Sequence, residues 1–300
     1  MKNYEIKIEP TSNPSIVKFE ANHFLTDHSS FEFENIDAAK KSPLAQQLFY
    51  LPFVKRIFIA QNFVAIDKYD IVTWADVQEE VALQIKEYLN SGQEVVQEST
   101  VSNKKLPVTI YAESTPNPSV QKFVANKKLV LQTYEIKNID EAKTAPLAQA
   151  LFQFPFVKEI FFDENYISIT KHDMVEWNDI SAEIREFLRT YLEQGKPVLD
   201  DHSAPSMHTK TDTVIDVGSL DSISQEIIAI LEEHVKPAVA SDGGNIAFSS
   251  YDQNTKAVHV VLQGACSGCP SSTVTLKNGI ETMLKEMLPG KIERVTAVNG

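Results

Sequence analysis

The feature that most constrains the fold of this chain is an internal repeat in its first two thirds. The repeated pairs are residues 11–15 with 115–119, 43–46 with 146–149, 52–55 with 155–158, and Trp74 with Trp177. A segment that recurs with nearly constant spacing is a structural unit that has been duplicated. The sequence therefore predicts two copies of one domain, module one (1–97) and module two (107–198), joined by a polar linker at 98–106.

Each copy has the pattern of a small mixed α/β domain. In module one, Ser42 followed by Pro43 is typical of a helix start, because Ser caps the helix and Pro fits its first turn. Apolar residues at helical spacing predict a longer helix over 74–89. The runs 54–59 and 63–67 are rich in β-branched and aromatic residues and predict a hairpin.

The sequence favours a recognition role for the modules over a catalytic one. Neither copy contains a cysteine, a glycine-rich phosphate loop or a repeated acid–base pair, and the histidines fall at positions that do not match. Asn13 and Asn117, each followed by proline, predict a turn, because an Asn side chain can bond its own backbone; a contact with a partner is the alternative. We expect the modules to bind client or donor proteins.

The pattern changes after a second polar linker, residues 199–213. A helix capped by Ser219 or Asp221 is expected to end near Pro237, and adjacent Gly243 and Gly244 predict a turn with positive φ. The chain then predicts, in order, strands over 245–250 and 257–262, a helix that starts at Pro270 and Ser271 and has its apolar stripe over 276–287, and a strand over 292–298. This gives a C-terminal domain (214–300) of order α-β-β-α-β, and an α+β fold of three small domains.

Cys266 and Cys269 are the only cysteines among 300 residues, and they lie in a turn between a predicted strand and helix. Helix N-termini favour the thiolate, which is both the nucleophile and the metal ligand. Gly264 and Gly268 let the backbone bend so that both sulfurs can point the same way. The spacing therefore indicates either a metal ligand pair or a redox pair.

Four interpretations of this cysteine pair compete. An inert buried pair is the simplest. A thiol–disulfide oxidoreductase requires a thioredoxin-like context, which this short domain lacks. A structural zinc ion requires four ligands, and no second Cys pair or spaced His pair follows; His202 and His208 lie in the linker. An iron–sulfur cluster held by four thiolates requires two chains, each supplying two, related by a two-fold axis.

The composition of the chain narrows the classes of partner that it can bind. The net charge is −13, which disfavours binding to nucleic acid, because phosphate backbones reward clustered Lys and Arg. No stretch approaches the ~20 apolar residues that span a bilayer, and the N-terminus has neither a signal core nor a transit pattern. We expect a protein of the cytoplasm with no nucleic-acid or membrane partner.

The run from Gly264 to Ser272 (Gly-Ala-Cys-Ser-Gly-Cys-Pro-Ser-Ser), preceded by Asp242-Gly243-Gly244, resembles the C-terminal domain of the NifU family. The motif Thr-x-Asn-Pro followed by Lys-Phe in both modules resembles the N-terminal domain of Nfu-type scaffold proteins. The family usually has one such domain where this chain has two.

The resemblance implies a non-enzymatic scaffold or carrier, which receives an iron–sulfur cluster from a donor and passes it to apo-proteins. The family's cluster ligands correspond to Cys266 and Cys269 here. A [4Fe–4S] cluster bridging a homodimer is favoured over [2Fe–2S] through the family alone. A thiol–disulfide oxidoreductase using the same two cysteines is the alternative.

Overall fold

The computed structural model describes residues 3–26, 29–97, 107–200, 221–267 and 270–299. The chain divides into two compact units, Met1–Pro107 and Val108–Gly300. The first unit contains module one. The second contains both module two and the C-terminal domain.

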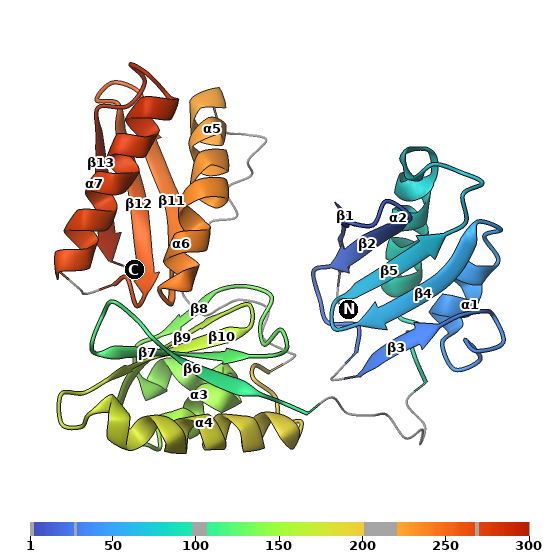
Figure 1. The fold of residues 1–300 in the computed structure, drawn as a ribbon, viewed down its shortest axis with the longest axis horizontal. Coiled ribbons are helices and arrows are strands. Elements are labelled where there is room, and N and C mark those ends of the chain that lie inside the picture. The colour runs from blue at the N-terminus through green and yellow to red at the C-terminus, as the bar shows by residue number, and fades with distance from the viewer. Residues whose placement is uncertain (1–2, 27–28, 98–106, 201–220, 268–269, 300) are drawn as a thin grey trace. The chain divides into compact units, whose positions relative to one another are not determined.

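Module one is an antiparallel sheet covered by two helices on one face (Figure 1). Its strands have the spatial order β1-β2-β5-β4-β3. The elements are β1 (Ile6–Pro10), β2 (Ile16–Ala21), β3 (Ser30–Phe33), α1 (Pro43–Phe49), β4 (Val54–Ala60), β5 (Phe63–Lys68) and α2 (Trp74–Asn90). The predicted hairpin and both predicted helices of module one are present. The short edge strand β3 was missed, because four residues carry too little alternation to predict a strand.

Local chemistry explains where α1 begins. The Ser42 hydroxyl accepts a hydrogen bond from the Ala45 N–H at 3.2 Å and donates one to the Val95 carbonyl at 2.7 Å. Pro43 occupies the first turn, where its missing N–H breaks no helical bond. The predicted cap is therefore confirmed, and it also ties the end of the module to its first helix.

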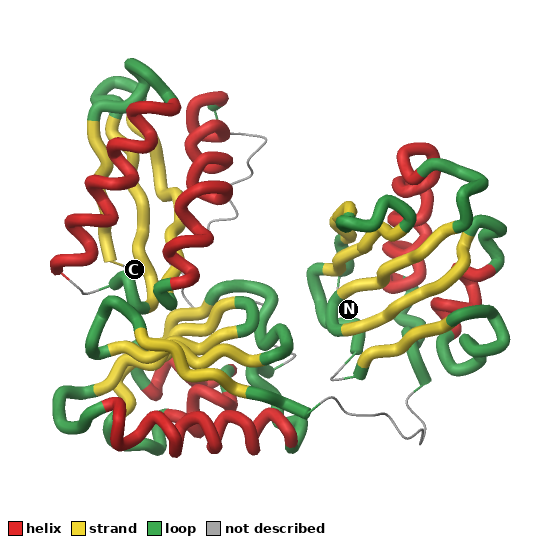
Figure 2. Tube along the Cα trace, in the orientation of Figure 1, coloured by secondary structure: helices red, strands yellow, loops and turns green. Residues whose placement is uncertain are grey.

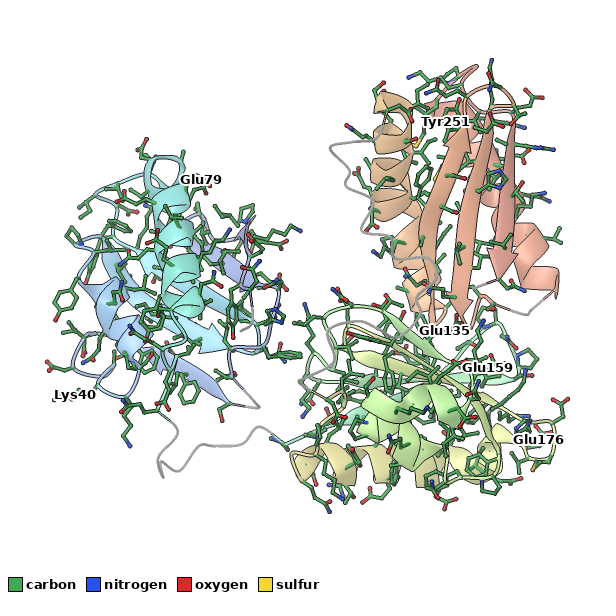
Figure 3. The ribbon with its side chains drawn as sticks, turned by 180° about the vertical axis from the view of Figure 1, so that it is seen from behind. Lys40, Glu79, Glu135, Glu159, Glu176 and Tyr251 are labelled. Atoms are coloured by element: carbon green, nitrogen blue, oxygen red, sulfur yellow. The ribbon has the colours of Figure 1, made fainter. Side chains whose placement is uncertain are left out.

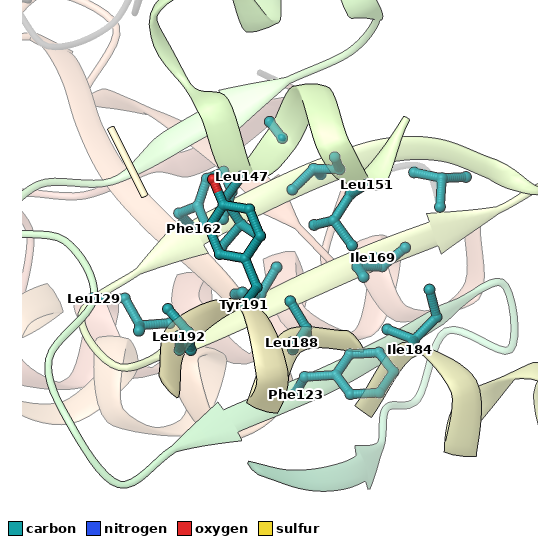
Figure 4. Packing of buried hydrophobic residues seen from close by; sticks show 14 of the residues in the cluster. Phe123, Leu129, Leu147, Leu151, Phe162, Ile169, Ile184, Leu188, Tyr191 and Leu192 are labelled. Atoms are coloured by element: carbon teal, nitrogen blue, oxygen red, sulfur yellow. The ribbon is translucent and has the colours of Figure 1, made fainter. Parts of the chain in front are cut away.

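Module two repeats this architecture with strand order β6-β7-β10-β9-β8. Figure 4 shows its core, in which Phe123, Leu147, Phe162 and Leu188 fill the space between sheet and helices. The elements are β6 (Ile110–Ser114), β7 (Val120–Ala125), β8 (Tyr134–Ile136), a 3₁₀ helix (Ile139–Thr144), α3 (Pro146–Leu151), β9 (Val157–Asp163), β10 (Tyr166–Lys171) and α4 (Trp177–Glu193). The helices lie on one face of the sheet, so the other face is left to other contacts.

The C-terminal domain has a three-stranded sheet, β11-β12-β13, and Figure 2 shows its strands in yellow and its helices in red. β11 and β12 are antiparallel, and β12 and β13 are parallel. Its elements are α5 (Ser222–Ile230), a π-helical turn (Leu231–Val235), α6 (Lys236–Ser241), β11 (Gly244–Asp252), β12 (Ala257–Gly264), α7 (Pro270–Met287) and β13 (Arg294–Asn299). Helices and strands share one apolar core. The α-β-β-α-β order and the α+β class predicted from the sequence are confirmed.

One helix boundary was predicted wrongly. Asp221 caps α5 as expected, but the helical segment does not end near Pro237: it passes through the π-helical turn and continues as α6 to Ser241. Pro237 falls in the first turn of α6, where a missing N–H is tolerated. The wider π turn just before it absorbs the interruption. As a result the Gly243-Gly244 turn begins directly at the end of α6.

Candidate functional site: the Cys266 loop

Cys266 lies in the loop that leaves β12 and enters α7, as the sequence predicted. Gly264 ends β12 with φ +61°, and its carbonyl accepts a hydrogen bond from the Ser267 N–H at 3.0 Å, so the chain reverses sharply around the cysteine. The Cys266 side chain is 7% exposed and belongs to the core of the C-terminal domain. Cys269 lies outside the described residues.

The Gly243-Gly244 turn supports this loop from the neighbouring strand. Gly243 has φ +81°, the left-handed conformation that the sequence predicted for the turn. Its carbonyl accepts a hydrogen bond from the Ala265 N–H at 3.1 Å. Position 244 requires glycine for a different reason, because a Cβ on Gly244 would lie 2.7 Å from the Cys266 Sγ. Gly244 therefore leaves the space that the thiol occupies, a requirement that the turn pattern did not reveal.

Module two contributes two hydroxyl groups to the same turn. The Ser168 hydroxyl donates to the Gly243 carbonyl at 2.6 Å, and the Tyr166 hydroxyl donates to the Gly244 carbonyl at 2.8 Å. Both side chains come from β10 and both are buried. A Cβ on Gly243 would lie 2.8 Å from the Ser168 Oγ, so the turn and the module are in direct contact.

Two further hydrogen bonds hold the residues that precede Cys266. The Asn117 Nδ2 donates to the Ala265 carbonyl at 3.2 Å, and the Gly264 N–H donates to the Glu135 Oε1 at 3.2 Å. Glu135, on β8, is labelled in Figure 3. Asn117 Oδ1 also accepts from the Ser119 N–H at 3.1 Å. The same Asn side chain thus makes the predicted turn and also contacts the C-terminal domain of its own chain, and a contact with a separate partner protein stays a prediction.

A buried lysine completes the contact. The Lys122 Nζ lies 3.1 Å from Glu113 Oε2, donates to the Ser241 carbonyl at 3.3 Å, and stands 4.7 Å above the Tyr166 ring. Its stem packs along the sheet while its charge is shared among these acceptors. We call the set Asn117, Lys122, Glu135, Tyr166 and Ser168 the docking face.

Burial changes the acidity of the groups in and beside the docking face. It raises the pKa of the Asp163 carboxyl, although hydrogen bonds from Tyr166 and Thr133 oppose part of the effect. Burial also raises the pKa of Glu135, against the hydrogen bond from Gly264. Burial and the nearby Asp163 charge raise the pKa of Tyr166, which keeps its hydroxyl protonated as a donor.

The sequence placed the functional residues in the C-terminal domain, and the docking face was not predicted. The only signal was Asn117, for which a partner contact was one alternative. His202 and His208 lie outside the described residues. Within the described ranges, no group of three or more His, Cys, Asp or Glu side chains could hold a metal ion, and no helix there is long and apolar enough to cross a membrane.

The fold and the loop together define a modular α+β protein in which Cys266 lies beside a glycine turn. Family models agree: "Scaffold protein Nfu/NifU N terminal" matches residues 6–92 and again 110–195, and "NifU-like domain" matches 227–296. The chain belongs to the Nfu/NifU family, as the sequence motifs predicted.

Relatives support the same assignment. "NifU-like protein 4, mitochondrial" of Arabidopsis thaliana is 33% identical over 197 residues, 65% of this chain and 68% of that protein. "NFU1 iron-sulfur cluster scaffold homolog, mitochondrial" of Drosophila willistoni is 35% identical over 196 residues, 65% of each chain. The chain thus spans about two thirds of each of these relatives. A solution structure of a NifU-like protein from Saccharomyces cerevisiae is 29% identical, covers 35% of this chain and 94% of its own, and has a TM-score of 0.31.

The names of the first two relatives give a mitochondrial location. The cytoplasmic location predicted from the sequence remains a prediction.

Proposed function

We propose that this chain is an iron–sulfur cluster scaffold or carrier that binds a cluster through Cys266 and Cys269 and passes it to apo-proteins. The observation that carries the proposal is the cysteine pair itself. It holds the only cysteines in the chain and lies within the segment matched by the NifU-like domain. The relative from Drosophila willistoni is named as an iron–sulfur cluster scaffold.

The number of ligands supports a cluster shared between two chains. Iron–sulfur clusters are usually held by four thiolates, and each chain supplies two. A symmetric pair of chains completes the set. A cluster held by two ligands from each chain can leave by exchanging them for a client's thiolates, so the role is non-enzymatic. The [4Fe–4S] type is preferred through the family resemblance.

The loop fits a thiolate ligand of this kind. Gly244 leaves room at the Cys266 Sγ, where any side chain would intrude. Gly264, with φ +61°, turns the chain sharply just before Cys266. The two modules, which have no cysteine, are assigned to the recognition of cluster donors and client proteins.

Anaerobic reconstitution with iron and sulfide tests the proposal. We expect a coloured dimer, with iron and sulfide content and Mössbauer spectra that identify the cluster type, and a mass by light scattering of twice the chain mass. Cys266→Ser and Cys269→Ser should each abolish both colour and dimer. Ser267→Ala, between the two cysteines, is the matched control and should load normally.

A colourless monomer with reactive thiols would overturn the proposal. Iron-free turnover in a disulfide-reduction assay, lost in the same Cys→Ser variants, would instead establish the oxidoreductase alternative. Transfer is tested by mixing the loaded dimer with an apo [4Fe–4S] protein and following the recovery of its activity.

A further inference from the structure

The docking face distinguishes the two copies of the duplicated module. Strand register gives the equivalent positions. Ser168 pairs with Lys122 and Phe161 in module two, and Ala65 pairs with Lys18 and Phe58 in module one. Module one therefore has no hydroxyl where Ser168 donates to the Gly243 carbonyl.

The second hydroxyl is missing as well. Tyr166 pairs with Asp163 in module two, and Phe63 pairs with Ala60 in module one. Phe63 keeps the ring but lacks the hydroxyl that donates to the Gly244 carbonyl. The Lys18 Nζ stands 4.9 Å above the Phe63 ring, so the lysine–ring pair is preserved while the donor is lost.

Other parts of the face are common to both copies. The repeat places Asn13 at the position of Asn117 and Glu32 at that of Glu135. Asn13 Oδ1 accepts from the Ser15 N–H at 3.1 Å, the same turn that Asn117 makes. The two copies thus share these Asn and Glu positions, and they differ at the two donors that meet the Gly243-Gly244 turn.

We propose that Tyr166 and Ser168 determine which copy docks on the Cys266 loop: module two is the intramolecular cap of this loop, and Phe63 and Ala65 exclude module one from that role. The occupant of the docking face is the turn at 241–244 together with Gly264 and Ala265 of the same chain. Hydrogen bonds from module two hold the glycine turn and the two residues that precede Cys266, and losing them releases the loop.

The cap also affects cluster loading. This effect rests on the proposed function, whereas the cap itself does not. A cluster shared by two chains requires two Cys266 loops to face each other. The docking face holds the same backbone that a second loop must approach. Module two therefore undocks before the cluster is shared, and its docking equilibrium sets how readily an apo chain accepts a cluster.

The test measures access to Cys266 without iron or sulfide. In the full chain carrying Cys269→Ser, Cys266 is the one thiol, and its rate of alkylation under native conditions reports opening of the cap. Tyr166→Phe with Ser168→Ala should raise this rate about 25-fold, because each hydrogen bond lost to the turn corresponds to about 5-fold in the docking equilibrium. Phe63→Tyr with Ala65→Ser in module one should leave the rate unchanged.

A second pair of variants guards against a folding defect. Asn117→Asp keeps the oxygen that accepts from Ser119 but replaces the Nδ2 donor by an oxygen that repels the Ala265 carbonyl. Alkylation should rise at least about 5-fold. Asn13→Asp makes the same change in the equivalent turn of module one and should have no effect.

Wild-type alkylation rates in folded Asn117→Asp and Tyr166→Phe/Ser168→Ala variants would overturn the proposal, because the C-terminal domain alone would then bury the thiol. An equal rise in Asn13→Asp would also overturn it. A protection that grows with protein concentration would assign the cap to a second copy and refute intramolecular docking. Because no metal is present, these outcomes are independent of whether the chain binds a cluster.

Discussion

Replacing Gly244 by alanine is the sharpest test of how the glycine turn serves the thiol. The new Cβ would lie 2.6 Å from the Gln263 carbonyl oxygen and 2.7 Å from the Cys266 Sγ. Gln263 belongs to β12 and pairs with Asn245, so its backbone cannot move without disturbing the sheet. The strain must therefore be relieved at the thiol loop, at the strand pairing, or at both.

The magnitude follows from the two contacts. Forcing one extra methyl group into a packed site costs about 1–3 kcal/mol. For the second compact unit, Val108–Gly300, about 2 kcal/mol lowers the melting temperature by about 4–8 °C. Differential scanning calorimetry of the full chain should show this shift in the transition of the second compact unit. Anaerobic reconstitution should show reduced iron per dimer, because the displaced Sγ no longer has its native position.

Gly279→Ala is the matched control. Gly279 lies within α7, and a Cβ there would meet no heavy atom within 4 Å. Alanine in a helix interior is favoured over glycine by about 1 kcal/mol, so this variant should melt higher and load normally. If Gly244→Ala melts and loads like the wild type, the inferred role of Gly244 as space for the thiol is refuted.

Three further predictions concern the modules. Ser42→Ala removes the hydroxyl that accepts from the Ala45 N–H and donates to the Val95 carbonyl. It should lower the free energy of unfolding of the first unit in urea by about 1–2 kcal/mol, and no loss would contradict the capping role of Ser42. The Trp74 Nε1 donates to the Ser15 carbonyl at 3.0 Å, whereas the Trp177 Nε1 has no hydrogen-bond partner in the described structure. Trp74→Phe should therefore lower the free energy of unfolding by about 1 kcal/mol more than Trp177→Phe, and equal losses would refute this. Because burial raises the pKa of Asp163 above its ordinary 3.8, its contribution to stability is present below that value and is lost as pH rises through the raised pKa. Asp163→Asn should flatten the dependence of melting temperature on pH, and an unchanged slope would exclude Asp163 as its source.

Local patterns in the sequence carried most of the fold. The repeat predicted the duplicated module, and the cap at Ser42 and the spacing over 74–89 predicted its helices. In the C-terminal domain, the glycine turn and the apolar runs predicted the α-β-β-α-β order. Each of these signals is a preference of neighbouring residues, so each can be recognised without knowing the tertiary fold. The π-helical turn before Pro237 was not predicted, because it depends on how the helix packs.

The cysteine pair is likewise a property of the sequence alone, since its spacing and its glycines are adjacent in the chain. The tertiary structure decided what surrounds it. Gly244 makes room for the Cys266 Sγ across two strands, and the hydroxyls of Tyr166 and Ser168 reach backbone carbonyls more than 70 positions away. A backbone carbonyl accepts a hydrogen bond whatever its side chain is, so no pattern in the sequence marks it as the partner. Only the packing of module two against the C-terminal domain reveals that these hydroxyls meet the thiol loop.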